Sequence, residues 1–302
     1  MLHVDSHRID PAYRAALAQT GLTRVDDVLA RTEGRICAWS RTTDTLHVPG
    51  QGGMPGFFVK RYLYPNWKNR LRGMFRGTFF GRHRGRAEYD LLSQMRVLGL
   101  PSVRPVAYGA RRVGHFLTAC YLITEEVPEA SNLTVFARRA TNGPHGLTFA
   151  ERRAFVRELA RQVAEVHAAE FAHGQLFWRN ILVRTGPAGD AEFFLLDPRP
   201  GKAGRRIRRK PRWWLHELAH LAVSAGAFTT RTERLRFLVE YLTLRQTSGD
   251  LRELAERIER QSQRWARHEQ RRIRMSDRFE SWRRALAAEK ADEVESSVAV
   301  RA

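Results

Sequence analysis

The chain has 302 residues, of which 43% are hydrophobic and 10% aromatic, so it can form one large domain or two lobes. Its two cysteines lie far apart and lack the spacing of a metal site, so we expect reduced thiols and a cytosolic protein. The polar N-terminus and the absence of long apolar runs argue against a signal peptide and a membrane span. A net charge of +20 indicates a polyanionic partner: nucleic acid, an anionic membrane surface or a phosphorylated substrate.

The first part of the chain predicts a small β-rich unit. Residues 1–30 have the apolar spacing of a short helical lead-in, and residues 35–48 predict two short strands around a polar turn. A strand over 57–62 follows, with Lys60 in its middle. A charge inside an apolar strand needs a partner, although an edge lysine that faces water is the simpler alternative. The glycines at 50–56 favour a strand connection over a phosphate-binding loop.

Residues 65–86 form the first strongly basic segment. They hold seven Lys or Arg residues and no acidic residue, with four aromatic residues interleaved. This pattern predicts a flexible basic loop that contacts anionic headgroups or phosphates. A solvated loop with its aromatic residues folded inward is the alternative. A helix over 86–98 follows, with Glu88 in its first turn, and strands are expected at 103–109 and 116–127.

The second part of the chain predicts mainly helices. Candidate helices cover 133–140 and 148–172, and the second begins with the capping-box pair Thr148 and Glu151. Further helices are expected from 213 to about 245, and a long Arg-rich amphipathic region covers 250–290. A second basic segment, 202–212, precedes these last helices.

Between these helices, residues 173–197 read as a strand, a Gly/Pro turn and a second strand. Asn180 stands just before the first apolar run, 181–183, and Asp197 ends the second, 193–196. The two ends of a hairpin are neighbours, so one amide oxygen and one carboxylate would lie together. Two such hard oxygen ligands suit Mg²⁺, which completes its shell with water and phosphate. An ordinary hairpin with polar ends is the alternative.

The order of these features resembles the protein-kinase-like fold. His173-x-x-Leu176-x-x-x-Asn180 resembles the kinase catalytic loop H-R-D-L-x-x-x-N, and Asp197 stands at the metal-binding position of D-F-G. The resemblance implies an α+β, two-lobed fold. The expected lobes are a β-rich N-lobe at 1–127 and a helical C-lobe at 128–302.

More narrowly, the chain resembles the bacterial lipopolysaccharide core kinases, the Kdo/heptose kinase family. The resembling stretches occur in the family's order: FFVKRY (57–62), AEYDLLSQMRVLGLPSVRPVAYG (87–109), YLITEEV (121–127), HGQLFWRNILV (173–183), FFLLDPRPGK (193–202) and LHELAHLAVSA (215–225). Together they span about 57–225.

The resemblance implies a role for individual residues. ATP would be held by Lys60, Glu88 and a hinge segment, and Mg²⁺ by Asn180 and Asp197. The hinge residues are Glu125, Glu126 and Val127, and the catalytic set is His173, Gln175, Asn180 and Asp197.

The function that the resemblance implies is ATP-dependent phosphorylation of a sugar hydroxyl, on Kdo or heptose, in the lipopolysaccharide inner core. The expected partners are the lipopolysaccharide core or lipid A precursor and the anionic inner-membrane surface, with no nucleic acid. The expected location is cytoplasmic, peripheral on the inner membrane of a Gram-negative bacterium. The basic segments 68–86 and 202–212 would suit such a surface.

The chain departs from the kinase pattern at one catalytic position. Gln175 stands where the catalytic Asp is expected, and an amide can orient a hydroxyl but cannot take its proton. No glycine-rich loop is recognisable, and Pro198 and Arg199 follow Asp197 in place of Phe-Gly. A catalytically weak or inactive kinase-like protein that binds nucleotide and anionic glycolipid is therefore an alternative. A nucleic-acid-binding protein is a remote one, since it rests on charge alone.

Overall fold

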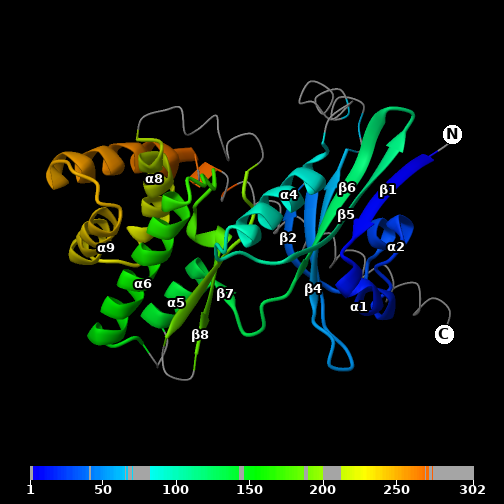
Figure 1. Cartoon of the computed structure of the whole chain (residues 1–302), viewed down its shortest axis with the longest axis horizontal. Helices are drawn as coiled ribbons and strands as arrows, with labels where there is room; N and C mark the ends of the chain where they lie inside the picture. Colours follow the sequence, from blue (N-terminus) through cyan, green and yellow to red (C-terminus); the bar gives the residue numbers. More distant parts are fainter. Residues whose placement is uncertain are drawn as a thin grey trace, which may run out of the picture.

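Helices and a β-sheet divide the protein into two lobes. The computed structural model describes residues 3–40, 42–64, 66, 70, 82–142, 146–186, 190–199, 212–268, 270, 271 and 274. The sheet lies to the right in Figure 1 and the helical lobe to the left, with helix α4 between them. This α+β, protein-kinase-like architecture is the one that the sequence predicts; the lobe boundary at 127/128 stays a prediction.

The N-terminal lobe is built on an antiparallel six-stranded sheet in the order β1-β5-β6-β4-β3-β2. The strands are β1 (His3–Ile9), β2 (Arg35–Ser40), β3 (Thr43–Val48), β4 (Phe57–Leu63), β5 (Pro105–Val113) and β6 (Phe116–Glu125). The buried positions of β3 and of the first half of β4 alternate, as expected for strands with one face against the core.

Strand β1 corrects the expected helical lead-in over residues 1–30. Residues His3–Ile9 pair with β5, from His3 opposite Val113 to Ile9 opposite Ala107. Helical structure begins only afterwards, with the 3-10 turn Pro11–Tyr13 and the short helices α1 (Arg14–Gln19) and α2 (Val25–Ala30). Most of β1 is exposed, so the strand carries no burial alternation and is held by its backbone ladder to a distant segment.

Helix α4 (Arg84–Val97) packs against the sheet and begins two residues before the predicted start. Its first turn lies close to β6, because a Cβ on Gly85 would stand 2.3 Å from the carbonyl oxygen of Tyr121. The buried residues of the helix include Glu88, Leu92 and Met95. The Glu88 carboxylate is therefore held on the side of the helix that faces the interior.

The C-terminal lobe contains α5 (Leu133–Asn142), α6 (Phe149–Ala168), α8 (Trp214–Ala225), α9 (Arg231–Leu244) and helical residues 251–268. The predicted capping box at the start of α6 is present, with Thr148 and Glu151 bonded to each other's backbone N–H groups. A small sheet of β7 (Ser131–Asn132), β8 (Ile181–Thr185) and β9 (Ala191–Leu195) forms the predicted hairpin and its neighbour.

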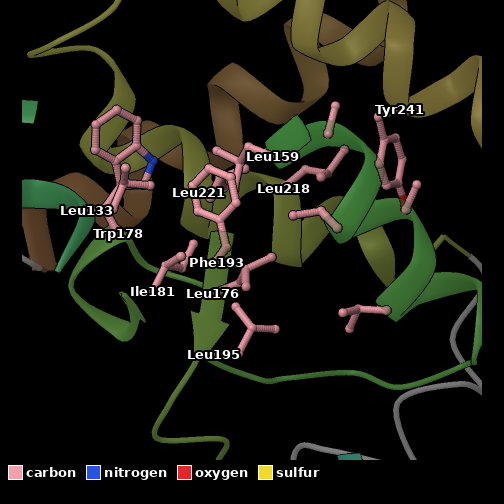
Figure 2. Close-up of a cluster of buried hydrophobic side chains, with 14 of the residues drawn as sticks. Leu133, Leu159, Leu176, Trp178, Ile181, Phe193, Leu195, Leu218, Leu221 and Tyr241 are labelled. Atoms are coloured by element: carbon pink, nitrogen blue, oxygen red, sulfur yellow. The ribbon is translucent and has the colours of Figure 1, made fainter. Parts of the chain in front are cut away.

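A single apolar core fills the C-terminal lobe and extends under α4. Figure 2 shows part of it, where Phe193 and Leu195 of β9 point towards the side chains of α6 and α8. The lobes are also joined by backbone. Val103 donates to the carbonyl of Leu195 at 3.1 Å, and Leu195 donates to that of Pro101 at 3.1 Å. The end of the hairpin is thus fixed to the segment that leads back into the sheet.

Several predicted features lie outside the described residues. These are most of the basic segment 68–86, nearly all of 202–212, and the apolar positions Ile273, Phe279 and Trp282 of the Arg-rich region. Both cysteines are free thiols, as the sequence suggested. Among the described helices, none is long and apolar enough to cross a membrane.

Candidate functional site: a lysine and two carboxylates between the lobes

Lys60 of β4 joins the two lobes through two carboxylates. Its Nζ lies 2.9 and 3.1 Å from the carboxylate oxygens of Glu88 on α4. The same nitrogen lies 2.7 Å from Oδ1 of Asp197, which follows β9 in the other lobe. Glu88 and Asp197 stand 28 and 137 positions from Lys60 in the chain, yet both contact its ammonium group. The alternative of a solvent-facing edge lysine is wrong.

Burial and charge set the protonation states of this cluster. Burial alone would lower the pKa of Lys60, but the Glu88 carboxylate, Tyr62 and Asp197 raise it well above its usual value. Burial raises the pKa of Glu88, with Lys60 opposing. Burial also disfavours ionised Asp197, but Lys60 outweighs it and lowers the pKa of that carboxyl. A protonated lysine thus faces an ionised aspartate at neutral pH.

Asp197 has a backbone conformation that most residues avoid. Its φ is 60°, in the left-handed region, where aspartate and asparagine are tolerated better than other non-glycine residues. One more backbone bond continues the hairpin ladder, from the N–H of Leu196 to the carbonyl of Asn180 at 3.0 Å. The hairpin therefore places Asn180 next to the residue that precedes Asp197, and the left-handed turn directs the Asp197 carboxylate to Lys60.

Gln175 and Asn180 form a short polar loop below this cluster. The Nδ2 of Asn180 donates to the carbonyl of Gln175 at 2.9 Å, and the N–H of Phe177 donates to the same oxygen at 2.8 Å. Asn180 is 4% exposed, whereas Gln175 is partly exposed. Because its amide nitrogen is committed, Asn180 has its Oδ1 left as a ligand atom.

His173 is fully buried and holds the loop to the hairpin. Its Nε2 lies 3.1 Å from the carbonyl of Leu196, and its Nδ1 accepts from the N–H of Gln175 at 3.3 Å. A carbonyl can only accept, so the ring carries its proton on Nε2. Burial lowers the pKa of His173, which keeps the ring neutral. With 0% exposure the ring contacts protein only, which makes it a positioning residue rather than one that touches substrate.

Glu217 on α8 anchors the same loop from the other side. Its carboxylate accepts from the backbone N–H of His173 at 2.8 Å and from that of Gly174 at 3.0 Å. Burial opposes its ionisation, but His220, His173 and His167 lower its pKa. No role was predicted for Glu217 from the sequence. The signal was present, because it is the only acidic residue in the apolar stretch WWLHELAHLAVSA, and a buried charge requires partners.

The predicted hinge residues lie at the end of β6, where the sheet leads into the helical lobe. The hydroxyl of Tyr13 donates to Oε2 of Glu125 at 2.6 Å, and His47 lies 2.9 Å from the Glu126 carboxylate. Both carboxylates therefore contact neighbouring protein. The backbone N–H of Glu126 donates to Gly56 at 2.8 Å, so the hinge is tied to the start of β4.

The described residues contain no cluster of three or more His, Cys, Asp or Glu side chains that could hold a metal ion by themselves. Asn180 and Asp197 offer one amide oxygen and one carboxylate. That pair suits a hard cation that takes most of its ligands from water and phosphate, as Mg²⁺ does.

The site combines a lysine that is paired with a glutamate on a helix, an asparagine at the start of a hairpin and an aspartate after that hairpin. This arrangement is that of a protein-kinase-like phosphotransferase. The sequence profile of the lipopolysaccharide kinase (Kdo/WaaP) family matches residues 19–241, and the chain belongs to that family.

Lipopolysaccharide kinases are among the relatives and solved structures that are similar to this chain. The lipopolysaccharide core heptose(I) kinase WaaP of Pseudomonas aeruginosa is 27% identical over 222 residues, 72% of this chain and 81% of that protein. The 3-deoxy-D-manno-octulosonic acid kinase of Pasteurella multocida is 24% identical over 170 residues, 56% of this chain and 65% of that protein. A structure of WaaP in complex with acyl carrier protein aligns with a TM-score of 0.58, at 24% identity, over 87% of this chain and 99% of that one.

Proposed function

We propose that the protein is an ATP-dependent kinase that phosphorylates a sugar hydroxyl, on Kdo or heptose, in the lipopolysaccharide inner core. The observation that carries the proposal is the contact of Lys60 with both Glu88 and Asp197, which joins the lobes at one cationic point. Family membership and the two kinase relatives support it.

In this proposal Lys60 binds the α- and β-phosphates of ATP while Glu88 orients its ammonium group. The hinge at Glu125–Val127 contacts the adenine through its backbone, because both hinge carboxylates already have protein partners. Asn180 Oδ1 and the Asp197 carboxylate would hold Mg²⁺, which would supply neutralising charge for the phosphates. With Asp197 engaged as a metal ligand, the Lys60 ammonium would be free to bind phosphate.

Gln175 is assigned to the acceptor hydroxyl. Its side chain is partly exposed beside Asn180, and its amide oxygen can accept a hydrogen bond from the hydroxyl without taking the proton. A loose phosphoryl-transfer transition state needs little general-base help, so positioning by Gln175 supports turnover at a reduced rate. A carboxylate at this position is expected to accelerate transfer by about 10²-fold.

The test is transfer of the labelled γ-phosphate of ATP to deep-rough lipopolysaccharide, with the phosphorylated sugar then located. Mg-ATP should raise the melting temperature of the wild type, and Asp197→Asn should remove that rise while retaining the left-handed backbone. Gln175→Asp should raise the transfer rate. If Mg-ATP leaves the melting temperature of the wild type unchanged, the kinase proposal is contradicted.

The site of action proposed here is the cytoplasmic face of the inner membrane, with peripheral attachment through basic surfaces. The charge of +20 supports it, at about 1 kcal/mol per basic residue near an anionic surface. Sedimentation with vesicles should increase with the fraction of anionic lipid and decrease with salt. Equal binding to neutral vesicles would contradict electrostatic attachment.

A second partner is proposed from a cavity in the helical lobe. An apolar cavity of about 1020 Å³ is bordered by α5, α6, α8 and α9, with Leu159, Trp178, Leu218 and Leu221 among its lining residues, several of which Figure 2 shows. Arginines also line it, Arg231 and Arg234 among them. Since a similar fold has been solved with acyl carrier protein, we propose that this cavity takes an acyl chain delivered by such a carrier.

Cavity filling tests this partner. Ala222→Phe places a ring in the cavity and should weaken binding of palmitoyl acyl carrier protein at least about tenfold. Ala154→Phe adds the same bulk at an exposed position of α6 outside the cavity and should leave binding unchanged. Equal binding of palmitoyl and uncharged carrier would contradict an acyl-chain site.

A further inference from the structure

Arg84, the first residue of α4, is a second cation at the Lys60 cluster. Its guanidinium carbon lies 4.6 Å from the ring centroid of Tyr62, and Lys60 Nζ lies 5.4 Å from the same centroid. The Tyr62 hydroxyl donates to Glu88, so the ring belongs to the cluster. From the sequence, Arg84 was predicted only to be part of a basic loop.

The backbone from which the Arg84 side chain extends is packed closely against β6. Gly85, the next residue, lies so close to β6 that any larger side chain there would collide with the Tyr121 carbonyl, at 2.3 Å from Cβ. The backbone N–H groups of Arg84 and Gly85 also face the buried thiol of Cys120. The N-cap His83 accepts from the N–H of Arg86 at 3.2 Å. The first turn of α4 therefore delivers Arg84 in a fixed direction.

The neighbouring arginines point elsewhere. Arg82 pairs with Asp90 at 3.0 Å, and Arg86 lies 4.0 Å from the same carboxylate and 6.0 Å from the Tyr108 ring centroid. Among the described residues, no carboxylate lies within ion-pairing distance of Arg84. Within the part of the chain that the structure describes, no carboxylate therefore occupies the guanidinium donors of Arg84.

The charges of the Lys60 cluster affect the pKa of Arg84. Burial alone would lower the pKa of Arg84, but Tyr62, Asp197 and Glu88 raise it. Arg84 in turn helps Lys60 to lower the pKa of Asp197 against the effect of burial. Arg84 is therefore coupled electrostatically to Tyr62 and to both carboxylates of the cluster.

In kinases of this fold, a glycine-rich loop covers the nucleotide phosphates. Here the sequence that links β2 (Arg35–Ser40) to β3 (Thr43–Val48) contains no glycine. We propose that Arg84 binds the terminal phosphate of the nucleoside triphosphate and takes over part of that loop's role. This inference rests on the proposed kinase function. A guanidinium group offers two parallel N–H donors that match two phosphate oxygens, which a lysine cannot reproduce.

The experiment compares a diphosphate with a triphosphate. Calorimetric titration would measure Mg-ADP and the Mg complex of a non-hydrolysable ATP analogue against wild type, Arg84→Gln, Arg84→Lys and Arg86→Gln. Arg84→Gln should weaken the analogue about 10- to 100-fold and ADP less than about twofold. Arg84→Lys should fall between wild type and Arg84→Gln, and Arg86→Gln should match the wild type for both ligands.

The outcomes separate this inference from the kinase proposal. Equal weakening of ADP and the analogue by Arg84→Gln, or no weakening of either, overturns the terminal-phosphate role while wild-type binding keeps the kinase proposal. Wild-type protein that binds neither nucleotide overturns both. Ligand-free melting temperatures identify any variant that lost its fold, and Arg84→Lys then supplies the comparison.

Discussion

Two neighbouring residues of β4, Lys60 and Arg61, are both cations in ion pairs, yet the two pairs serve different purposes. Their side chains point to opposite faces of the sheet. Arg61 pairs with Asp44 through Nε at 2.7 Å and Nη2 at 2.8 Å, and its Nη1 donates to backbone carbonyls at and just beyond the end of α2. Every part of its guanidinium is used within one lobe.

Lys60 differs because its partners come from different lobes and remain partly open to solvent. Its side chain is 18% exposed and that of Asp197 is 26%, whereas the side chains of Arg61 and Asp44 are 10% and 11% exposed. A ligand can replace Asp197 at Lys60, but nothing can enter the Arg61 pair without disrupting the lobe. Partners that come from separate lobes and stay partly exposed therefore distinguish a ligand-binding ion pair from a structural one.

Breaking the closed ion pair, Arg61 with Asp44, is expected to have the largest effect on stability. Arg61→Met leaves the Asp44 carboxylate buried without its partner and should lower the free energy of unfolding by about 3–5 kcal/mol. Urea denaturation would measure it. Asp44→Leu combined with Arg61→Met removes both charges and should recover most of the loss. A single-variant cost below about 1 kcal/mol would show that the pair is not structural.

Breaking the open pair should reduce activity more than stability. Lys60→Met is expected to lower phosphoryl transfer about 10²- to 10³-fold, because a preorganised cation at the phosphates is lost. Its stability cost should be about 1–2 kcal/mol, because Glu88 can take up a proton and Asp197 reaches solvent. Rates and urea curves on one preparation would test the contrast. Equal stability losses for Lys60→Met and Arg61→Met would end the distinction.

Acid should destabilise closed polar sites in both lobes. Burial lowers the pKa of His83 and of His167 from 6.5 to about 4. The unfolded chain therefore takes up these protons first as pH falls, so stability is complete above about pH 6.5 and declines towards pH 4. At pH 5 the loss is about 2 kcal/mol per histidine.

Melting temperatures between pH 7 and pH 5 would measure this decline. His167→Gln should make it shallower by the share of one histidine, whatever its effect at pH 7. His167 lies 2.7 Å from the Tyr241 hydroxyl, so the variant also loses or alters one buried hydrogen bond. An unchanged pH dependence would show that His167 does not control it.

Local patterns predicted much of the fold and part of the site. Short runs around a polar turn predicted β3, an apolar run predicted β4, and a capping box marked the start of α6. The positions of Asn180 and Asp197 on either side of a turn predicted the hairpin that brings them close. Lys60 was recognisable because a charge in an apolar strand needs a partner. These features depend on residues a few positions apart, so the sequence alone determines them.

Tertiary structure decided the contacts between distant segments. Strand β1 exists because β5 offers it a backbone ladder, and Glu217 reaches a loop 44 residues away. The hydroxyl of Tyr13 donates to Glu125, which lies 112 positions away in the chain. The carboxylate of this predicted hinge residue is therefore used within the protein. The close approach of Gly85 to β6 fixes the start of α4, which places Arg84, among three alternating arginines, beside the Tyr62 ring. Such contacts leave no periodic signature, since they arise only when the packed core brings remote backbone and side chains together.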